Sequence, residues 1–489
     1  MNRHRLRLSL LVVCAPLLLG FVLPQCGGLK SVDFERISLN GFDPVDEAQD
    51  KNSYAWAMDY FLPDGAQDGH LYVGTGNNLG GLLAYGVMAV VNGEDPREGA
   101  PIRPPEIRRY RPGLGPMEWE RVLDYRDIES DPNWRTIGFR YMTTYRAKND
   151  GVNYLYAASM GAVPALWRSA SGNPGDWELV LEFDTGSIRW MEEHQGLLYL
   201  SLATDIPGTD LVRIGRIWAT DGDTVWPVIE DGFGNPDNIE VECLTSYNGW
   251  LYAGTLNQST GYEVWKLAGP NGDEPPVQIV ANGGPDPRND IAGTPKIFKG
   301  KLYIGSLIFQ GGFNVETLNG FKGCDIIRID ENDHWETVVG KNSISGYDSG
   351  FNHFTNAYLW WMEEHDGWLY ASTYDQAAML QPLVEYLPEL IPALINGELG
   401  DLLDDSAFEK RSLLEWLFNS GCDLYKSEDG IHWGEVFQNG LGNPNNYGIR
   451  TMKSIGSYLY LGTANNNEGL EIWRGMPKDG AAAELDTAE

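Results

Sequence analysis

The chain returns seven times to a short apolar segment built around Leu-Tyr or Tyr-Leu-Tyr. The copies centre on Tyr72, Tyr156, Tyr199, Tyr252, Tyr303, Tyr370 and Tyr460. Each copy is rich in aromatic and β-branched residues and is bounded by Gly, Asn or Asp, which predicts a β-strand. Self-similarity of this kind is the signature of repeat architectures, so it constrains the fold before any residue-level chemistry is considered.

Each Leu-Tyr segment belongs to a longer unit. In the two clearest copies, Trp250–Thr255 is followed by Gly261–Lys266, and Tyr458–Thr463 is followed by Gly469–Arg474. The second segment of each copy has the pattern Gly, any residue, an acidic residue, an apolar residue, Trp and a basic residue. Four strands per unit give an antiparallel sheet that cannot bury both faces alone. Radial stacking of the sheets buries these faces and leaves few free edges. We therefore predict an all-β fold, a seven-bladed β-propeller over residues 30–475.

The two ends of the predicted ring complement each other. The seventh unit stops at Arg474 without a fourth strand, whereas Phe34–Pro44 is a spare segment that resembles Trp433–Pro444, the predicted fourth strand of the sixth unit. We predict that the N-terminal segment near Val32–Leu39 completes the last blade and closes the ring.

Some turns between third and fourth strands resemble a known motif. Ser427–Trp433, with the sequence Ser-Glu-Asp-Gly-Ile-His-Trp, resembles the Asp box of sialidase-like propellers, and Asp221–Trp226 is a looser relative. The resemblance implies a structural turn in which the carboxylate accepts hydrogen bonds from backbone N–H groups and the Trp packs between sheets. It implies a fold and no particular activity.

The first residues indicate export. Arg3, Arg5 and Arg7 precede an apolar run that is short for a membrane span, which predicts a signal peptide over residues 1–26. Leu23-Pro24-Gln25-Cys26 resembles a bacterial lipobox with Cys26 as the lipidated residue, although Gln25 replaces the usual small residue. Lipidation of Cys26 and ordinary cleavage are the two alternatives. We expect an exported bacterial protein that is periplasmic, anchored to the outer membrane or extracellular. Residues 476–489 are predicted to form a disordered tail.

The charge disfavours nucleic acid as a partner. The chain has 36 Lys and Arg against 69 Asp and Glu, a formal net charge of −33, which repels phosphate backbones. Such a charge suits an extracellular protein, a cationic partner, bound calcium or a salty habitat. No Cys or His cluster has metal-ligand spacing, so we predict no metal site and no cofactor, with calcium as an open alternative.

Three cysteines lie in the predicted propeller, namely Cys243, Cys324 and Cys422. An odd number excludes complete pairing within the chain. Cys324 and Cys422 occupy the same place in successive units, which allows a disulfide, but buried free thiols are favoured.

Large connections between second and third strands concentrate on one face. They are Gly76–Glu106, Thr204–Gly215, Leu307–Lys322 and Tyr374–Ser420. In a propeller these connections share a face with the loops between blades, so we expect function there. The insertion at residues 375–420, in blade six, is predicted to be helical from the capping box of Ser406 and Glu409. A lid, a docking element, a membrane-touching flap and a satellite core are its alternative roles.

The first strand of each unit should line the central channel. Alignment on the Leu-Tyr strands places seven residues at equivalent positions near the insertion-bearing mouth: Trp56, Arg140, Arg189, Glu242, Gly293, Trp360 and Arg450. Arg binds carboxylate or phosphate with two-pronged geometry, and Trp faces stack on sugars or cations. All but Gly293 are candidate ligand-binding residues. The alternative is a structural network in which Arg189 and Arg450 pair with Glu240 or Glu242.

Two other features resemble parts of catalytic sites. Sialidases also grip a carboxylate with three arginines, but their Tyr nucleophile and its Glu partner have no motif here, and Tyr141 and Glu242 are the only local candidates. The sequence Trp-Met-Glu-Glu-His occurs at Trp190–His194 and Trp361–His365, at the opposite end of the first strands. Two identical copies indicate repeat history, so we predict a structural role.

Three functions remain as hypotheses. The favoured one is an exported propeller that binds a carbohydrate, an anion or an envelope protein at its insertion-bearing face, with a membrane contacted only through a lipid anchor. The second is a secreted glycan hydrolase or lyase, which needs two carboxylates near the mouth, such as Glu242 with Glu240 or Asp348. The third is an envelope scaffold that docks through Trp416 and Phe418 of the helical insertion. An enzyme is not favoured, because no complete catalytic set is evident.

Overall fold

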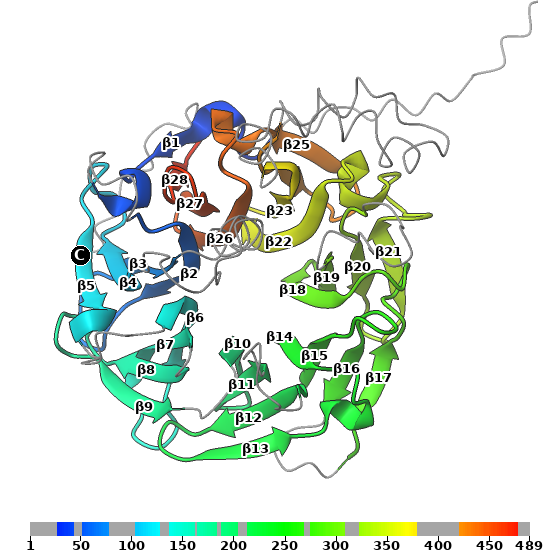
Figure 1. Ribbon diagram of the computed structural model, residues 1–489, viewed down its shortest axis with the longest axis horizontal. Helices are drawn as coiled ribbons and strands as arrows, with labels where there is room; N and C mark the ends of the chain where they lie inside the picture. Colours follow the sequence, from blue (N-terminus) through cyan, green and yellow to red (C-terminus); the bar gives the residue numbers. More distant parts are fainter. Residues whose placement is uncertain are drawn as a thin grey trace, which may run out of the picture.

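The computed structural model describes residues 27–43, 51–77, 103–127, 136–161, 164–182, 187–203, 213–267, 274–308, 322–378 and 420–477. Within these ranges the chain forms a ring of antiparallel sheets around a central axis, and each sheet runs outward from that axis (Figure 1). The predicted signal peptide with Cys26, most of the helical insertion with Trp416 and Phe418, and the tail beyond residue 477 lie outside the described residues.

The inner two strands of each sheet are the longest. The innermost strands are β2 (Tyr54–Phe61), β6 (Thr136–Arg146), β10 (Ser187–His194), β14 (Glu240–Tyr247), β18 (Ile291–Phe298), β22 (Asn356–His365) and β26 (Gly448–Ile455). The second strands, which carry the Leu-Tyr repeat, are β3 (His70–Gly76), β7 (Asn153–Gly161), β11 (Leu197–Ala203), β15 (Trp250–Leu256), β19 (Lys301–Leu307), β23 (Trp368–Asp375) and β27 (Tyr458–Ala464).

The outer two strands are shorter. The third strands are β4 (Glu106–Tyr110), β8 (Ala165–Ser169), β12 (Arg216–Thr220), β16 (Val264–Leu267), β20 (Ile326–Ile329), β24 (Leu424–Ser427) and β28 (Ile472–Gly475). The outermost strands are β5 (Glu120–Asp124), β9 (Glu178–Glu182), β13 (Val225–Ile229), β17 (Val277–Val280), β21 (Trp335–Val339), β25 (Trp433–Phe437) and β1 (Phe34–Arg36). Short 3-10 helices occur in the connections: η1 (Ser31–Asp33), η2 (Asn40–Phe42), η3 (Tyr125–Asp127), η4 (Gly232–Gly234), η6 (Ser349–Asn352) and η7 (Gly440–Gly442).

The pairing of consecutive strands identifies the fold as a β-propeller, as predicted. Blade one contains β2 to β5, and the next blades follow in groups of four to blade six, β22 to β25, a grouping consistent with the predicted seven blades. The repeat tyrosines are all buried, and some hydroxyl groups reach the next blade. Tyr252 Oη donates to Asp333 at 2.5 Å, and Tyr370 Oη accepts from Leu29 N at 2.8 Å. At these two positions the Tyr hydroxyl therefore joins neighbouring blades, a contact that Phe could not make.

The N-terminal strand closes the ring, which confirms the prediction. Strand β1 pairs antiparallel with β28, so that Phe34 opposes Gly475 and Arg36 opposes Trp473. The pairing continues past the strand, where Ile37 N donates to Ile472 O at 2.8 Å. Ile37 is fully buried. Blade seven therefore contains β26, β27, β28 and β1.

A buried side-chain contact, which we call the Asn clasp, fixes the start of the innermost strand in blades four to seven. The clasp pairs are Asn238 with Glu263, Asn289 with Asp325, Asn356 with Asp423 and Asn446 with Glu471. In blade seven, the Asn446 amide donates to Glu471 at 2.7 Å and to Gly440 O at 3.0 Å. Gly440 has a φ of 64°, and a Cβ there would lie 2.9 Å from Asn446 O, so only Gly suits this loop.

The Asn clasp also explains the acid and the Trp of the sequence repeat. The Glu471 carboxylate accepts a second hydrogen bond from Trp473 Nε1 at 2.9 Å. The backbone N–H of Glu471 donates to the hydroxyl oxygen of Thr463 at the end of the second strand. Glu263 and Trp265 make the same contact in blade four at 2.8 Å. In blades four and seven, the spacing of acid and Trp therefore reflects one hydrogen bond at the start of the third strand.

The Asp-box-like turns have the structural role that the resemblance implies. Asp429 Oδ1 accepts hydrogen bonds from Ile431 N and His432 N, both at 2.8 Å, and Trp433 is buried in the adjacent core. Burial opposes ionisation of Asp429, but the hydrogen bonds from His432 and the backbone lower its pKa to about 2. Asp221 accepts from Asp223 N and Thr224 N in the same way.

The cysteines and the large connections also follow the prediction. Cys243, Cys324 and Cys422 are buried free thiols. The four large connections join β3 to β4, β11 to β12, β19 to β20 and β23 to β24, each a second strand to a third, although most of their residues lie outside the described ranges. In the part of the chain that the structure describes, no helix is long and apolar enough to span a membrane.

We expect ring closure to contribute much of the stability. Replacing Ile37 with Asp should lower the free energy of unfolding by more than about 3 kcal/mol, because it places a charge where the closing segment is fully buried. Val32, which is 64% exposed, provides the matched control, and Val32→Asp should change it by less than about 0.5 kcal/mol. Urea unfolding would measure both, and equal effects would show that the closing segment is dispensable.

The Asn clasp gives a second prediction. Asn446→Ala removes the donor to Glu471 and leaves that buried carboxylate with fewer partners, so the free energy of unfolding should fall by about 2–4 kcal/mol. Among the described residues, the exposed Asn332 makes a hydrogen bond only through its backbone N–H, to Asp330, and Ala retains this donor. Asn332→Ala should therefore leave the urea midpoint unchanged. A neutral Asn446→Ala would mean that the clasp does not stabilise the blade.

Candidate functional site

Every innermost strand has a β-bulge at the position that the repeat alignment singled out. The pairing register shifts on either side of Trp56, Arg140, Arg189, Glu242, Trp360 and Arg450, and in β18 it shifts across Gly293 and Thr294. A bulge leaves one residue without a partner on the adjacent strand and re-aims its side chain. The seven equivalent positions are therefore defined by backbone geometry as well as by sequence.

The bulges bring all six candidate residues together around one cavity, which we call the bulge cavity. It has a volume of about 320 Å³ and includes Trp56, Arg140, Arg189, Glu242, Trp360 and Arg450 in its lining. These residues lie near the beginnings of the innermost strands, at the end of the channel that carries the large connections. The structure thus assembles the predicted set in one place, and its binding role remains a prediction.

Two of the arginines make ion pairs with two carboxylates inside the cavity. Arg140 lies 2.9 Å from Glu242, and Arg189 lies 2.9 Å from Glu240 and 3.7 Å from Glu242. The predicted structural network therefore exists for Arg189, and Arg140 joins it. Arg450 does not: its guanidinium lies over the rings of Trp360 and Trp361, at 5.7 and 6.0 Å from their centroids.

Arg450 is a buried cation without an ion pair among the described residues. It is 8% exposed, and within the described ranges it makes no ion pair or hydrogen bond. Burial lowers the pKa of Arg450 to about 9, and the positive charge of Arg140 acts in the same direction, although the negative charge of Glu242 acts to raise this pKa. The guanidinium is still protonated at pH 7. Because a buried charge is unfavourable without a partner, this arrangement favours an anion beside Arg450.

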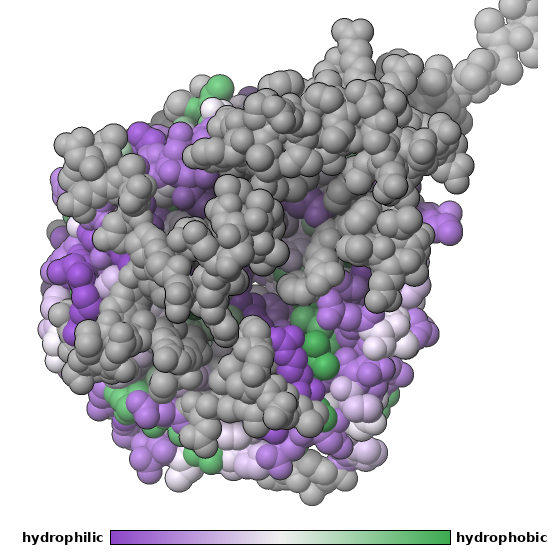
Figure 2. Space-filling view, viewed as in Figure 1, coloured by the Kyte–Doolittle hydropathy of each residue, from purple (hydrophilic) through white to green (hydrophobic). Residues whose placement is uncertain are grey.

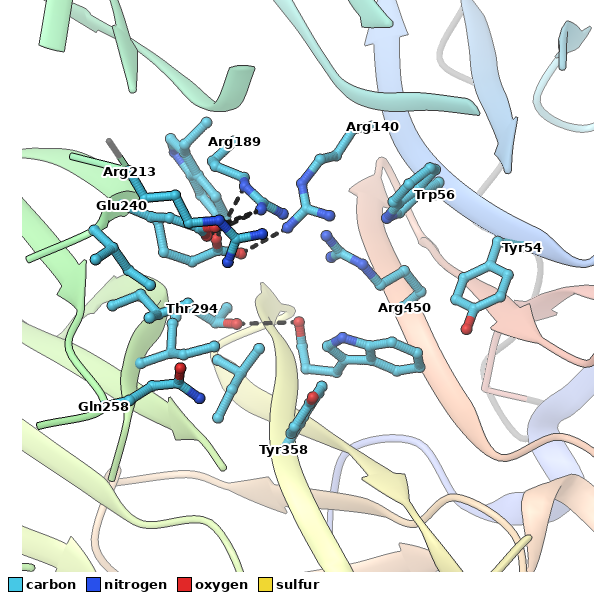
Figure 3. A pocket seen from close by; sticks show the side chains of 18 residues that line it. Tyr54, Trp56, Arg140, Arg189, Arg213, Glu240, Gln258, Thr294, Tyr358 and Arg450 are labelled. Atoms are coloured by element: carbon cyan, nitrogen blue, oxygen red, sulfur yellow. Dashed lines mark hydrogen bonds and ion pairs between the residues drawn. The ribbon is translucent and has the colours of Figure 1, made fainter. Parts of the chain in front are cut away.

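Four guanidinium groups face only two carboxylates. Figure 3 shows the side chains of Arg140, Arg189, Arg213 and Arg450 converging on one side of the cavity, with Tyr358 and Gln258 on the other. With both carboxylates ionised, the lining carries two more positive than negative charges. The cavity is therefore cationic within a chain whose formal net charge is −33.

The alignment of the repeats did not predict several residues that line the bulge cavity, although some of them occupy a regular position in the repeat. Tyr54, Ile291 and Tyr358 lie two residues before a bulge position, as does Glu240, which the sequence had already suggested as an ion-pair partner, so the same alignment, moved by two, finds them. Arg213 and Gln258 come from connections between second and third strands, where no repeat exists. No pattern in the sequence could have placed those two in the cavity.

An aromatic layer separates the bulge cavity from a second one, which we call the far cavity. Trp190 lines both cavities, stacks on Trp361 with ring centroids 5.5 Å apart, and lies 4.6 Å from Tyr141. The far cavity has a volume of about 450 Å³. Its lysines are paired, Lys453 with Asp59 at 2.5 Å and Lys296 with Glu363 at 2.7 Å.

The position of Tyr141 argues against a catalytic pair with Glu242. Tyr141 lines the far cavity and Glu242 lines the bulge cavity, so the structure does not bring the two local candidates into one site. Burial also raises the pKa of Tyr141 well above its ordinary value, which opposes a phenolate nucleophile. Asp348, the other carboxylate considered for hydrolysis, is exposed and does not line the bulge cavity.

The two Trp-Met-Glu-Glu-His segments join neighbouring blades, which supports their predicted structural role. His194 Nδ1 lies 2.8 Å from Ser246 Oγ, and Glu192 accepts from Ser246 N at 2.9 Å. The second copy repeats both contacts, from His365 and Glu363 to Ser454, at 2.9 and 3.2 Å. Each segment therefore connects one innermost strand to that of the next blade.

The described residues provide no evident metal centre. Among them, no group of three or more His, Cys, Asp or Glu side chains is arranged to hold an ion. The carboxylates of the bulge cavity are already paired with arginines, and those pairs would compete with a cation.

Comparison with known proteins gives a similarity in fold without a family. No family model and no curated protein matches the chain. Among solved structures it is similar to YCF48 bound to D1 peptide, with a TM-score of 0.44 and 11% identity over 91% of this chain and 97% of that chain. It is also similar to Sqt1 of Saccharomyces cerevisiae, with a TM-score of 0.40 and 10% identity over 87% of this chain and 96% of that chain.

A prolyl endopeptidase matches with a TM-score of 0.41 and 9% identity over 87% of this chain, and the match covers 50% of the endopeptidase chain. At such identities and scores, these similarities carry no inference about activity or partners.

Glu192 gives a prediction about pH. Burial raises its pKa to about 7, so the folded protein holds a proton that the unfolded chain releases at an ordinary carboxyl pKa. Stability should therefore fall as pH rises through the window between those two values. Glu192→Gln should remove about 2 kcal/mol of this fall between pH 5 and pH 8, because Gln carries no charge. The exposed Glu193→Gln is the control, and unfolding in urea across this range measures both. Identical pH profiles for Glu192→Gln and the natural protein would contradict the assignment.

Proposed function

We propose that the protein is an exported β-propeller that binds an anionic ligand in the bulge cavity. One observation carries the proposal: Arg450 is a buried, protonated guanidinium in the cavity, without an ionic partner among the described residues. Arg can grip a carboxylate or phosphate with two parallel hydrogen bonds. The ligand would supply the charge that the cavity lacks.

The surrounding groups support binding at this position. Arg140 is held by Glu242 and Arg189 by Glu240, so neither side chain is free to swing across the cavity and neutralise the space beside Arg450. Arg213 lines the same cavity and makes no ion pair within the described residues. A site whose charged groups are held in advance loses little entropy when the ligand binds.

Binding is favoured over catalysis because the carboxylates are engaged. A glycosidase needs one carboxyl group as acid and a second as base or nucleophile. In the bulge cavity, both Glu240 and Glu242 are engaged in ion pairs with arginines, so neither carboxylate is positioned as an unengaged group beside the space that a ligand would occupy.

Export is a second part of the proposal and rests on the N-terminal sequence. The basic residues and apolar run of residues 1–26 support secretion, with lipidation of Cys26 as one alternative. The strongly acidic composition agrees with a protein that works outside the cytoplasm without nucleic acid.

Substitution of Arg450 tests the binding proposal. Arg450→Met retains the length of the side chain and removes its charge, so affinity for carboxylates and inorganic phosphate should fall at least tenfold in titration calorimetry. The fold should survive, because replacing a buried unpaired charge with an apolar group is neutral or stabilising. Arg111, exposed and paired with Asp68, provides the control, and Arg111→Met should bind normally. Unchanged binding in Arg450→Met would refute the proposal.

A further inference from the structure

The bulge cavity has two chemically different arcs. Blades seven, one, two and three contribute one arc, with Arg450, Trp56, Arg140 and Arg189 at their bulges. Blades four, five and six contribute the other, in which the side chains beside the paired carboxylates are mainly apolar. These apolar residues are Ile239, Leu256, Ile291, Leu307, Tyr358 and Trp360. Figure 3 shows the labelled arginines on one side and Tyr358 on the other.

The absence of a side chain at Gly293 maintains the apolar arc in blade five. Gly293 lies at the bulge that in six other blades carries Arg, Glu or Trp. A Cβ at Gly293 would lie 1.6 Å from Leu307 Cδ1, so Leu307 occupies the space that a bulge side chain would need. The sequence thus places an aliphatic surface opposite the cationic arc.

The polar groups of the apolar arc are partly used by the protein itself. The Thr294 hydroxyl donates to the carbonyl oxygens of Leu359 and Trp360, at 3.1 and 3.0 Å. The carboxylates of blade four are turned to the arginines. On this side, among the described residues, a ligand with many hydroxyl groups would find mainly the Gln258 amide and the Tyr358 hydroxyl as side-chain partners, whereas an apolar group would lose water and contact buried aliphatic side chains.

We infer that the ligand is a small amphipathic organic acid, with its carboxylate beside Arg450 and an aromatic or branched apolar body against Leu256, Ile291 and Leu307. The inference rests on the proposed function and specifies its ligand. A volume of about 320 Å³ is near the lower limit of small-molecule sites, so the body is one ring or a short branched chain. Trp190, which stacks on Trp361, bounds the cavity on the side of the far cavity.

Five probes separate charge from apolar contact. Phenylacetate carries both features, acetate and inorganic phosphate carry charge alone, phenylacetamide carries the ring alone, and glucuronate carries a carboxylate on a hydroxylated ring. Titration calorimetry on the purified protein should show phenylacetate binding at least tenfold tighter than acetate or glucuronate, with no binding of phenylacetamide. In the series acetate, butyrate, hexanoate, each methylene should raise affinity by roughly fourfold until the cavity is full.

Ile291→Thr supplies the matched variant, because it places a hydroxyl in the apolar arc and leaves every arginine unchanged. It should lower phenylacetate affinity about tenfold and leave phosphate affinity unaltered. If glucuronate or phosphate binds as tightly as phenylacetate, and Arg450→Met abolishes that binding, the inference fails and the proposed function stands. If no anion binds at all, both fail. A flat affinity across the acetate to hexanoate series refutes the inference without any variant.

Discussion

The site depends on one backbone irregularity repeated around the ring, the β-bulge in each innermost strand. Regular strands alternate side chains between two faces, so neighbouring residues cannot both face the channel. Arg189 and Trp190 are neighbours, yet both line the bulge cavity, because the bulge inserts one residue between the two registers. The same irregularity lets one strand present a cation to the cavity and an aromatic ring to the layer beneath it. The cationic side chains of the bulge cavity and the aromatic layer that separates it from the far cavity therefore both result from the bulges.

In blades four to seven, the Asn clasp fixes where the innermost strand begins, and this sets the position of the bulge along the channel. A bulge places a side chain correctly only if its strand begins at a fixed height. In blade seven, the contact of Asn446 with Glu471 sets this height two residues before the strand begins, and Arg450 follows at the bulge. Asn238 does the same in blade four ahead of Glu242. The clasp residues are buried, and in blades four to seven they help to set the position of the bulge residue that follows. Figure 2 shows that the described surface on the face in view is mostly hydrophilic, with apolar residues in small separate patches.

Repetition is the reason that much of the fold could be predicted from the sequence. The Leu-Tyr strands predicted the blades, the missing strand after Arg474 predicted ring closure, and equivalent positions predicted that Arg140, Arg189 and Arg450 converge. The bulges could not be predicted, because every copy contains one and an alignment of the copies therefore shows no gap. For the same reason the sequence does not separate Tyr141 from Glu242, although Tyr141 lines the far cavity and Glu242 the bulge cavity.

Ring closure by β1 has a consequence for how the protein is made. Of the strands in the described residues, β1 is synthesised first and its partner β28 last, with Phe34 opposite Gly475. Throughout elongation the closing segment, with its buried Ile37, has no partner. A nascent chain that stops before β28 cannot close, and it exposes unpaired strand edges of the kind that aggregate or attract proteases. Closure therefore acts as a check on chain completeness, and only a chain translated through its last blade acquires a ring without open edges.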